Sequence, residues 1–318
     1  MFYGLLGPTR RWARSIFYGW WIVAACFTLQ CLSQGLLFNG FTVYFLPLKD
    51  EFGWSRTLLA SGFSLNLAWS GLLSPAQGWF IDRFGPKLLV LVGVILFGAG
   101  FLAFSQIHSI LGFFLAFSLL AIGSTMTGFI PITATVTNWF ARKRTLAIGI
   151  MMAGMSVGGL IVPVLAWSIT NNGWRTTAFV AGLLIWSIGI PAALTLRHKP
   201  EQYGYLPDGG RTSLVEVPNE QGSSAPIGQT GEALSRHSFT AREALRTPAF
   251  WLISLGHASA VFGVGAIFIH LVPHIVQRTG LSLEASGSIV AFMLIMSLIG
   301  QLAGGYLGDK HDKRALLM

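Results

Sequence analysis

Charged residues are scarce in this chain. They make up 10% of its 318 residues, and 53% of the residues are hydrophobic, whereas soluble domains carry about 25% charged residues. A soluble fold of this size could not cover so much apolar surface with polar groups, so the composition excludes a water-soluble globular protein. Lipid is the solvent that fits, and we predict an all-α integral membrane protein.

Cysteine is nearly absent, with Cys26 and Cys31 as the two examples. They lie five positions apart in one apolar run and point to different helix faces, which excludes a disulfide framework and predicts two small buried side chains. The sequence also lacks the G-x-x-x-x-G-K-[ST], H-E-x-x-H and C-x-x-C motifs. We therefore predict no ATP-driven step, no metal, no cofactor and no enzymatic activity.

Long runs without Lys, Arg, Asp or Glu are what the chain does contain. A helix needs about 20 apolar residues to cross a bilayer, and eight runs qualify. They are Phe17–Phe38, Thr57–Ile81, Leu88–Ile107, Ile110–Ala141, Thr145–Thr170, Thr176–Leu196, Pro248–Gln277 and Ala285–Gly308.

The basic residues are distributed unequally between the two sides of these runs. With the N-terminus inside, seventeen of the 21 Lys and Arg residues fall in inner segments, and the four outer ones are Lys49, Arg56, Arg175 and Arg278. Cytoplasmic loops carry such an excess, so we predict an inner (plasma) membrane protein with a cytoplasmic N-terminus. The same distribution accounts for the net charge of +9 without a nucleic-acid partner.

The chain divides into three parts. Residues 1–196 are predicted to form an N-terminal six-span bundle, and residues 248–318 the first two spans of a C-terminal bundle. Between them, residues 197–247 form a cytoplasmic linker whose middle is rich in Gly, Ser, Gln and Glu, which predicts flexibility. Thr240 and Glu243 form a capping box that predicts a short helix at the end of the linker.

An internal repeat relates the two bundles. The pattern Gly-x-x-x-Asp followed by a basic residue ends at Asp82-Arg83 and again at Asp309-Lys310, 227 positions later. A Gly-x-Ser element at Gly53 recurs at Gly280 with the same separation. Two spaced matches at one offset indicate two halves of like topology. We therefore expect twelve spans, of which eight are present in this chain as a fragment or a truncated product.

These motifs resemble those of a known family. The loop Gly78–Lys87, which reads G-x-x-x-D-R-x-G-P-K, resembles the hallmark loop of the major facilitator superfamily. The segments Tyr18–Val23 and Trp139–Gly149 are similar to the oxalate/formate antiporter and monocarboxylate transporter branch. The resemblance implies a major facilitator type helical bundle and secondary transport.

Two sets of candidate residues follow. The first set is a gating loop network at the inner ends of the spans, for which the alternative is a solvated loop with ordinary inside-positive charges. Its members are Asp82, Arg83, Gly85, Lys87, Arg142, Arg144 and Asp309. The resemblance implies that Asp82 meets the eleventh helix, which this chain lacks.

The second set consists of uncharged polar residues inside the spans, where secondary transporters bind their solutes. Its members are Gln34, Asn39, Asn66, His257, His270 and Gln301. No Asp, Glu, Lys or Arg lies in the eight runs, which excludes a buried-carboxylate proton relay there. His257 could titrate near neutral pH, and the alternative for it is a hydrogen bond to a neighbouring helix.

The resemblance also implies a Lys where Asn39 stands and an Arg near Gln301, and both cations are absent. Either the charge lies in the missing spans or the solute is not a simple carboxylate. We predict a monomeric secondary active transporter that moves a small organic solute by alternating access, coupled to protons or another gradient. The family resemblance favours a small organic anion, such as a monocarboxylate or dicarboxylate, as the solute. The alternatives are an exporter of hydrophobic compounds and a truncated, non-transporting membrane protein.

Overall fold

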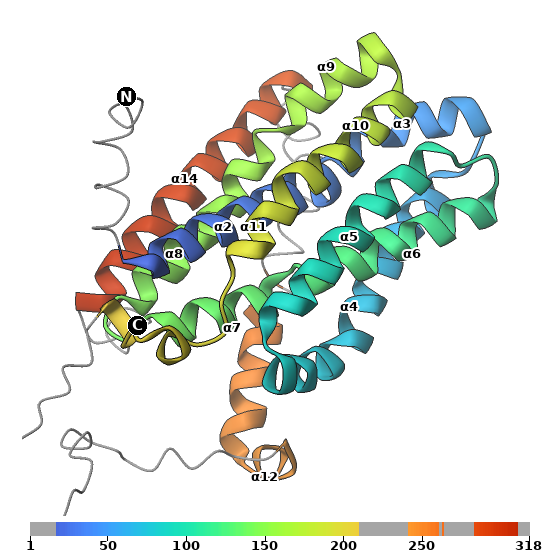
Figure 1. Cartoon of the computed structure of the whole chain (residues 1–318). Coiled ribbons are helices and arrows are strands. Elements are labelled where there is room, and N and C mark those ends of the chain that lie inside the picture. The colour runs from blue at the N-terminus through green and yellow to red at the C-terminus, as the bar shows by residue number, and fades with distance from the viewer. Residues whose placement is uncertain (1–16, 210–240, 261–262, 264–282, 311–318) are drawn as a thin grey trace, which may run out of the picture. The chain divides into compact units, whose positions relative to one another are not determined.

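The computed structural model describes residues 17–209, 241–260, 263 and 283–310. Their regular elements are helices (Figure 1). They are α2 Tyr18–Ser33, η1 Gln34–Phe38, α3 Phe41–Phe52, α4 Arg56–Phe84, α5 Pro86–Ser105, α6 Ile110–Met126, α7 Phe129–Trp139, α8 Arg144–Gly159, α9 Val162–Asn172, α10 Trp174–Leu184, η2 Ile185–Gly189, α11 Ile190–Thr195, η3 Pro200–Tyr203, η4 Pro207–Gly209, α12 Ala241–Leu245 and α14 Leu283–Lys310. Residues 248–260 are also helical.

Six helical stretches in the described residues are long and apolar enough to cross a membrane. They are Tyr18–Phe52, Pro86–Ser105, Ile110–Trp139, Arg144–Asn172, Trp174–Thr195 and Phe292–Lys310. Of the two other predicted spans, 57–81 lies within the 29-residue helix α4, which is more polar. The span predicted at 248–277 is helical over 248–260, and most of its remainder lies outside the described residues.

The first span is longer than predicted, because the helix does not end at Phe38. The π-helical segment η1 joins α2 to α3 through Asn39 and Gly40, both in right-handed helical conformation. The span therefore runs to Phe52 and ends at Gly53, whose φ of 65° forms a left-handed cap.

Two predicted spans are bent. The fourth is interrupted at Thr127–Gly128 between α6 and α7, and the fifth at Leu160–Ile161 between α8 and α9. Pro163 stands in the first turn of α9, where its missing N–H interrupts the hydrogen bonds of a continuous helix. The break between α8 and α9 therefore lies next to Pro163.

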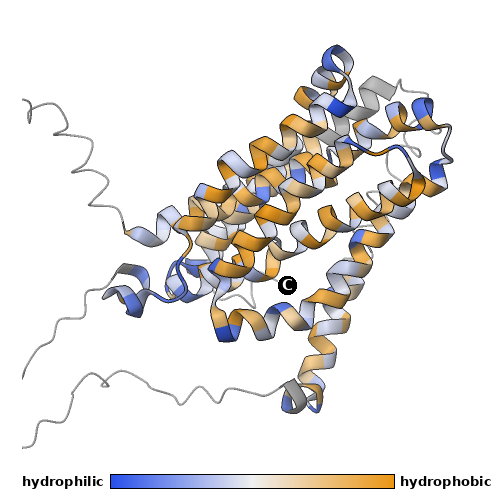
Figure 2. Cartoon of the chain, turned by 45° about the vertical axis from the view of Figure 1, so that its right-hand side comes forward, coloured by the Kyte–Doolittle hydropathy of each residue, from blue (hydrophilic) through white to orange (hydrophobic). Residues whose placement is uncertain are grey.

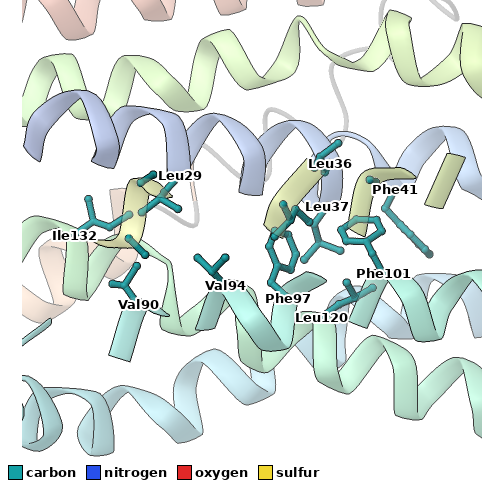
Figure 3. Close-up of a cluster of buried hydrophobic side chains, with 14 of the residues drawn as sticks. Leu29, Leu36, Leu37, Phe41, Val90, Val94, Phe97, Phe101, Leu120 and Ile132 are labelled. Atoms are coloured by element: carbon teal, nitrogen blue, oxygen red, sulfur yellow. The ribbon is translucent and has the colours of Figure 1, made fainter. Parts of the chain in front are cut away.

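Large apolar side chains fill the interior of the bundle and also cover much of its outside. Buried side chains of the first span meet those of α5, α6 and α7 (Figure 3). Leu67 and Leu111, by contrast, are 71% and 69% exposed. Figure 2 shows that hydrophobic residues predominate along the helices. Apolar surface on both sides of a helix is typical of a membrane bundle that faces lipid.

The chain forms two compact units. The first comprises residues 1–212 together with 294–318, and the second residues 213–293. The first unit contains α2 to α11 and the C-terminal part of α14, so it holds most of the candidate residues. The second unit contains α12 and the helical residues 248–260.

Candidate functional site

The middle of the first span departs from a regular α-helix at Gln34. In η1 the backbone N–H of Asn39 donates to the carbonyl of Gln34 across 2.8 Å, a bond that spans five residues instead of four. Segments of this kind are frequent at functional sites because the extra residue displaces side chains and carbonyls from their helical positions. Gln34 and Asn39 lie at the two ends of this segment.

Backbone contact between the first and fifth spans positions this segment. A Cβ added to Gly35 would lie 2.7 Å from the carbonyl oxygen of Gly158, and one added to Gly158 would lie 2.6 Å from the carbonyl oxygen of Cys31. The small residues let α2 and α8 approach more closely than side chains permit. Gly158 of span five therefore serves helix packing.

Three amide side chains converge on the stretch of α8 from Ser156 to Gly159. Gln301 of α14 accepts a hydrogen bond from the Ser156 hydroxyl at 3.3 Å. A Cβ added to Gly159 would lie 3.6 Å from Nδ2 of Asn39, and one added to Gly158 would lie 3.1 Å from Cβ of Gln34. We name Gln34, Asn39, Gln301 and Ser156 the amide cluster.

The amide cluster lies near the middle of its helices. Gln34, Ser156 and Gln301 each stand close to the centre of the membrane-length stretches Tyr18–Phe52, Arg144–Asn172 and Phe292–Lys310. The cluster is polar and carries no formal charge. It can donate and accept hydrogen bonds, because each amide offers two N–H donors and a carbonyl acceptor.

Ser156 also belongs to a Gly-x-Ser-x-Gly sequence, Gly154–Gly158. In hydrolases this pattern exposes the serine on a sharp strand-to-helix turn. Here Ser156 is buried inside the continuous helix α8 and donates to Gln301. The motif therefore serves helix packing and polar pairing.

The other three pathway candidates are Asn66, His257 and His270. Asn66 is buried between α4 and α6, where its Nδ2 donates to the Ser124 hydroxyl at 3.2 Å. His257 is exposed on the helical residues 248–260 in the second compact unit. His270 lies outside the described residues. The roles of these three residues stay predictions.

The turn between α4 and α5 holds four of the gating candidates. Asp82, Arg83 and Lys87 are exposed, and the Arg83 guanidinium lies over the Trp79 ring at 5.6 Å. Gly85 has a φ of 81° and ends α4, a conformation that a residue with a Cβ rarely adopts. Its glycine is therefore required by the backbone of the turn.

A histidine that the sequence analysis did not select packs against this turn. A Cβ added to Gly85 would lie 3.1 Å from Cγ of His198. The imidazole Nδ1 is buried and has no hydrogen-bond partner among the described residues. Burial lowers the pKa of His198, and Lys199 lowers this pKa further, while Asp82 and Glu201 act in the opposite direction.

Asp309, at the end of α14, caps α8. Its two carboxylate oxygens accept hydrogen bonds from the backbone N–H groups of Thr145 and Leu146 at 2.8 and 2.9 Å. α8 has no side-chain cap of its own at Lys143, so Asp309 takes the place of the N-cap residue and of a negative charge at the helix N-terminus.

Close helix contact supports this cap. A Cβ added to Gly149 of α8 would lie 2.5 Å from the carbonyl oxygen of Gln301, and one added to Gly305 would lie 3.1 Å from that of Thr145. Figure 1 shows α14 beside α8. The glycines therefore let the end of α14 reach the N-terminus of α8.

The basic residues at the start of α8 have separate contacts. The Arg144 guanidinium donates to the carbonyl oxygens of Phe140 and Thr137, at 3.1 and 3.2 Å. It thereby supplies hydrogen-bond donors to carbonyl groups at the C-terminus of α7. The Arg142 side chain is exposed, but its backbone N–H donates to Asp208 at 2.6 Å. Asp208 was not selected from the sequence, although Pro207-Asp-Gly209 is a turn signature.

The segment after the sixth span packs against the start of α2 and the end of α7. The Arg197 guanidinium lies between the rings of Tyr18 and Tyr203, 3.9 and 4.2 Å from their centroids. The Trp139 indole N–H donates to the Arg197 carbonyl at 3.0 Å. The cation–π contact with Tyr18 holds the start of the linker to α2, and the hydrogen bond from Trp139 holds it to α7.

A second polar group lies at the opposite ends of the helices. Arg175 at the start of α10 forms an ion pair of 2.7 Å with Glu51 of α3, and the Trp174 indole donates to the same carboxylate at 2.6 Å. Arg175 also donates to the carbonyl oxygens of Ser105 and Ile107. A cavity of about 270 Å³ lies beside it.

Comparisons with known proteins agree with this architecture. The chain is 28% identical over 294 residues to monocarboxylate transporter 11 of Homo sapiens, an alignment that covers 92% of this chain and 57% of that protein. It is 25% identical over 256 residues to the oxalate:formate antiporter of Oxalobacter formigenes, an alignment that covers 80% of this chain and 55% of that protein. The fujikurins efflux protein of Gibberella fujikuroi is 26% identical over 295 residues, which cover 91% of this chain and 57% of that protein.

The chain thus spans little more than half the length of these relatives. The sequence model of the Major Facilitator Superfamily matches residues 23–318. This match confirms the resemblance drawn from the loop Gly78–Lys87 and from the segments Tyr18–Val23 and Trp139–Gly149. The family consists of membrane transporters, in agreement with the prediction of a multi-pass membrane protein that is not an enzyme. The chain belongs to the major facilitator superfamily.

Proposed function

We propose that the protein is a secondary transporter that moves a small organic solute by alternating access, with the amide cluster as part of the solute site. The observation that carries this proposal is the convergence of Gln34, Asn39 and Gln301 on α8 near the centres of their spans. These residues come from both copies of the internal repeat, and secondary transporters bind solutes between such repeats.

A small organic anion is the solute class that we favour. Two relatives are named for monocarboxylates and for oxalate and formate. The amide cluster lacks a cation, but amide N–H groups and a serine hydroxyl can donate to a carboxylate. A neutral donor set binds a carboxylate more weakly than Arg or Lys does, so we expect a low affinity unless a further span supplies the charge.

The gating set belongs to the same proposal. Asp309, which caps α8, would hold the two repeats together at the inner side while the solute site faces outward, and would release α8 when the site faces inward. The proposal includes coupling to protons or another gradient, an inner membrane location with a cytoplasmic N-terminus, and a monomer. It also keeps a six-span bundle at 1–196, a linker at 197–247 and the beginning of a second bundle at 248–318.

Uptake by the full encoded protein in proteoliposomes tests both solute and site. We expect labelled lactate, oxalate or formate to enter above the level of empty vesicles. Gln301→Ala should raise KM about tenfold, the effect of roughly 1.4 kcal/mol of lost binding. Gln106→Ala is the matched control, because Gln106 lies at the end of α5 and outside the amide cluster, and should leave KM unchanged.

Two outcomes would contradict the proposal. Uptake no greater than in empty vesicles for all three solutes would remove the carboxylate class. An unchanged KM for both Gln301→Ala and Ser156→Ala would remove the amide cluster as the solute site.

Export of hydrophobic compounds is the second candidate function. One relative is named as an efflux protein, and the uncharged amide cluster favours an apolar solute more than a cationic site would. Inside-out vesicles discriminate between the two, since an exporter accumulates a hydrophobic dye in them and leaves labelled lactate outside.

A further inference from the structure

Asp208 binds three consecutive backbone N–H groups. Its carboxylate accepts from Ala141, Arg142 and Lys143 at 3.0, 2.6 and 3.2 Å. Successive N–H groups of this kind form a nest that binds anions, and bonds to a carboxylate are stronger than bonds between neutral groups. The turn between α7 and α8 is therefore built around the side chain of Asp208.

The backbone of Asp208 is itself unusual. Its φ is 63°, a left-handed conformation that is uncommon for residues other than glycine and is several-fold enriched for Asp and Asn. Such positions persist where the surroundings fix them. The three hydrogen bonds to the turn provide that fixation, so the conformation and the contact depend on each other.

The nest of Asp208 adjoins the site of Asp309 without overlapping it. Asp208 takes the N–H groups of residues 141–143, and Asp309 takes those of Thr145 and Leu146. A helix N-terminus offers N–H groups in a binding geometry only if the residues before it are ordered. Asp208 supplies that order for residues 141–143.

The attachments of the two carboxylates differ. Asp309 stands on α14, in the second copy of the repeat. Asp208 follows Tyr205, whose ring contacts those of Phe17 and Trp139 at centroid distances of 6.2 and 6.3 Å. Asp208 thus remains with the first copy when Asp309 leaves.

From these contacts we propose that Asp208 is a positioning residue of the inner gate: it keeps the turn before α8 formed, so that Asp309 can leave and rebind without reordering the backbone. This proposal rests on the alternating-access function proposed above. Removing the Asp208 carboxylate then weakens closure at the inner side through the Asp309 contact and not by a route of its own.

The experiment measures how often the inner gate is closed. Spin labels at Gln202→Cys and Leu307→Cys, both exposed positions, report the distance between the linker and α14 in a Cys26→Ala/Cys31→Ser background. The full encoded protein is placed in lipid nanodiscs, and the ratio of short to long distances is compared among variants.

We expect Asp208→Ala to lower that ratio about fivefold and Asp309→Ala to lower it at least as much. The double variant should equal Asp309→Ala alone, since Asp208 acts through that contact. Asp208→Asn keeps one acceptor oxygen and should fall between wild type and Asp208→Ala. Glu201→Gln, which removes a neighbouring charge of the same sign, should leave the ratio unchanged.

An unchanged ratio in both Asp208 variants, or a double variant whose effect equals the product of the single effects, overturns the positioning role and leaves the transport proposal intact. One distance population that persists in wild type and in Asp309→Ala overturns both proposals. Faster amide exchange of residues 140–146 in Asp208→Asn is the second expected result, and unchanged exchange there also refutes the proposal.

Discussion

Carboxylates from distant parts of the chain replace the missing cap of α8. Asp309 was expected in a gating network from its position in the repeat, and the structure gives it a partner, the N-terminus of α8. Asp82 occupies the equivalent place in the first copy and is exposed. By the 227-residue offset, the symmetry of the repeat predicts that Asp82 caps the eleventh helix in the same way.

Other residues could not be found from local patterns. Asp208 and His198 contact residues that lie about sixty to more than a hundred positions away in the sequence. No rule of residue spacing reveals these partners. The amide cluster was predicted as a set of polar residues inside apolar spans, but its convergence on Ser156–Gly159 depends on how α2, α8 and α14 pack. Sequence reasoning supplied candidates, and packing selected among them.

At His198 we predict a pH-dependent loss of stability. Because burial lowers its pKa, the unfolded chain, with an ordinary histidine pKa of about 6.5, binds a proton more readily than the folded protein. The free energy of unfolding therefore falls as the pH drops through that range. Thermal unfolding followed by tryptophan fluorescence between about pH 7.5 and 5.5 measures this slope.

His198→Gln should reduce the slope, because glutamine cannot take up a proton. Gln106→Ala, at the end of α5, removes no ionisable group, so it serves as the control and should keep the slope of wild type. If His198→Gln and wild type show the same slope, the buried imidazole has no part in the acid sensitivity.

At the scale of elements, apolar runs predicted where the spans lie but not how they bend. The fourth and fifth spans were each expected as one helix, and each divides in two. Pro163 gave a signal for one break. The π-helical segment η1 had no comparable signal, because it arises where Gly35 meets Gly158 and not from the propensity of the residues in it.

Gly158→Ala should destabilise the bundle by about 2 kcal/mol, within the range found for overpacked sites. Its new methyl group would lie 2.6 Å from the Cys31 carbonyl oxygen, and two helix backbones would have to separate. The melting temperature of the purified protein in detergent measures the effect.

Gly71→Ala is the control for this substitution. Gly71 lies inside α4 with open space around its Cα, and alanine favours a helix over glycine. We expect no loss of stability there. Equal melting temperatures for the two variants would show that α2 and α8 are not in backbone contact.

At the scale of the whole molecule, composition and the repeat were the most informative signals. They predicted a membrane protein with two like halves, and the family match confirms the membership. Basic residues gather at one end of the described helices, among them Lys87, Arg142 and Lys310, and a smaller number at the other. The side of the membrane that each end faces stays a prediction.

Cysteine labelling in intact cells tests that orientation. In a cysteine-free background, a membrane-impermeant maleimide should label Asn172→Cys at the end of α9 from outside. It should label Lys87→Cys and Lys143→Cys only after the cells are opened, as the excess of basic residues requires. Labelling in the reverse order would invert the topology and contradict an inner gate at Asp309.

The ion pair between Glu51 and Arg175 has a further consequence for motion. It ties the end of the first span to the start of the sixth, together with Trp174 and two carbonyl oxygens at the end of α5. Spreading these tips apart would break all of these bonds at once, whereas tilting the helices as one block would break none. The ends of the first, third and sixth spans therefore resist separation from one another, while the three helices remain free to tilt together.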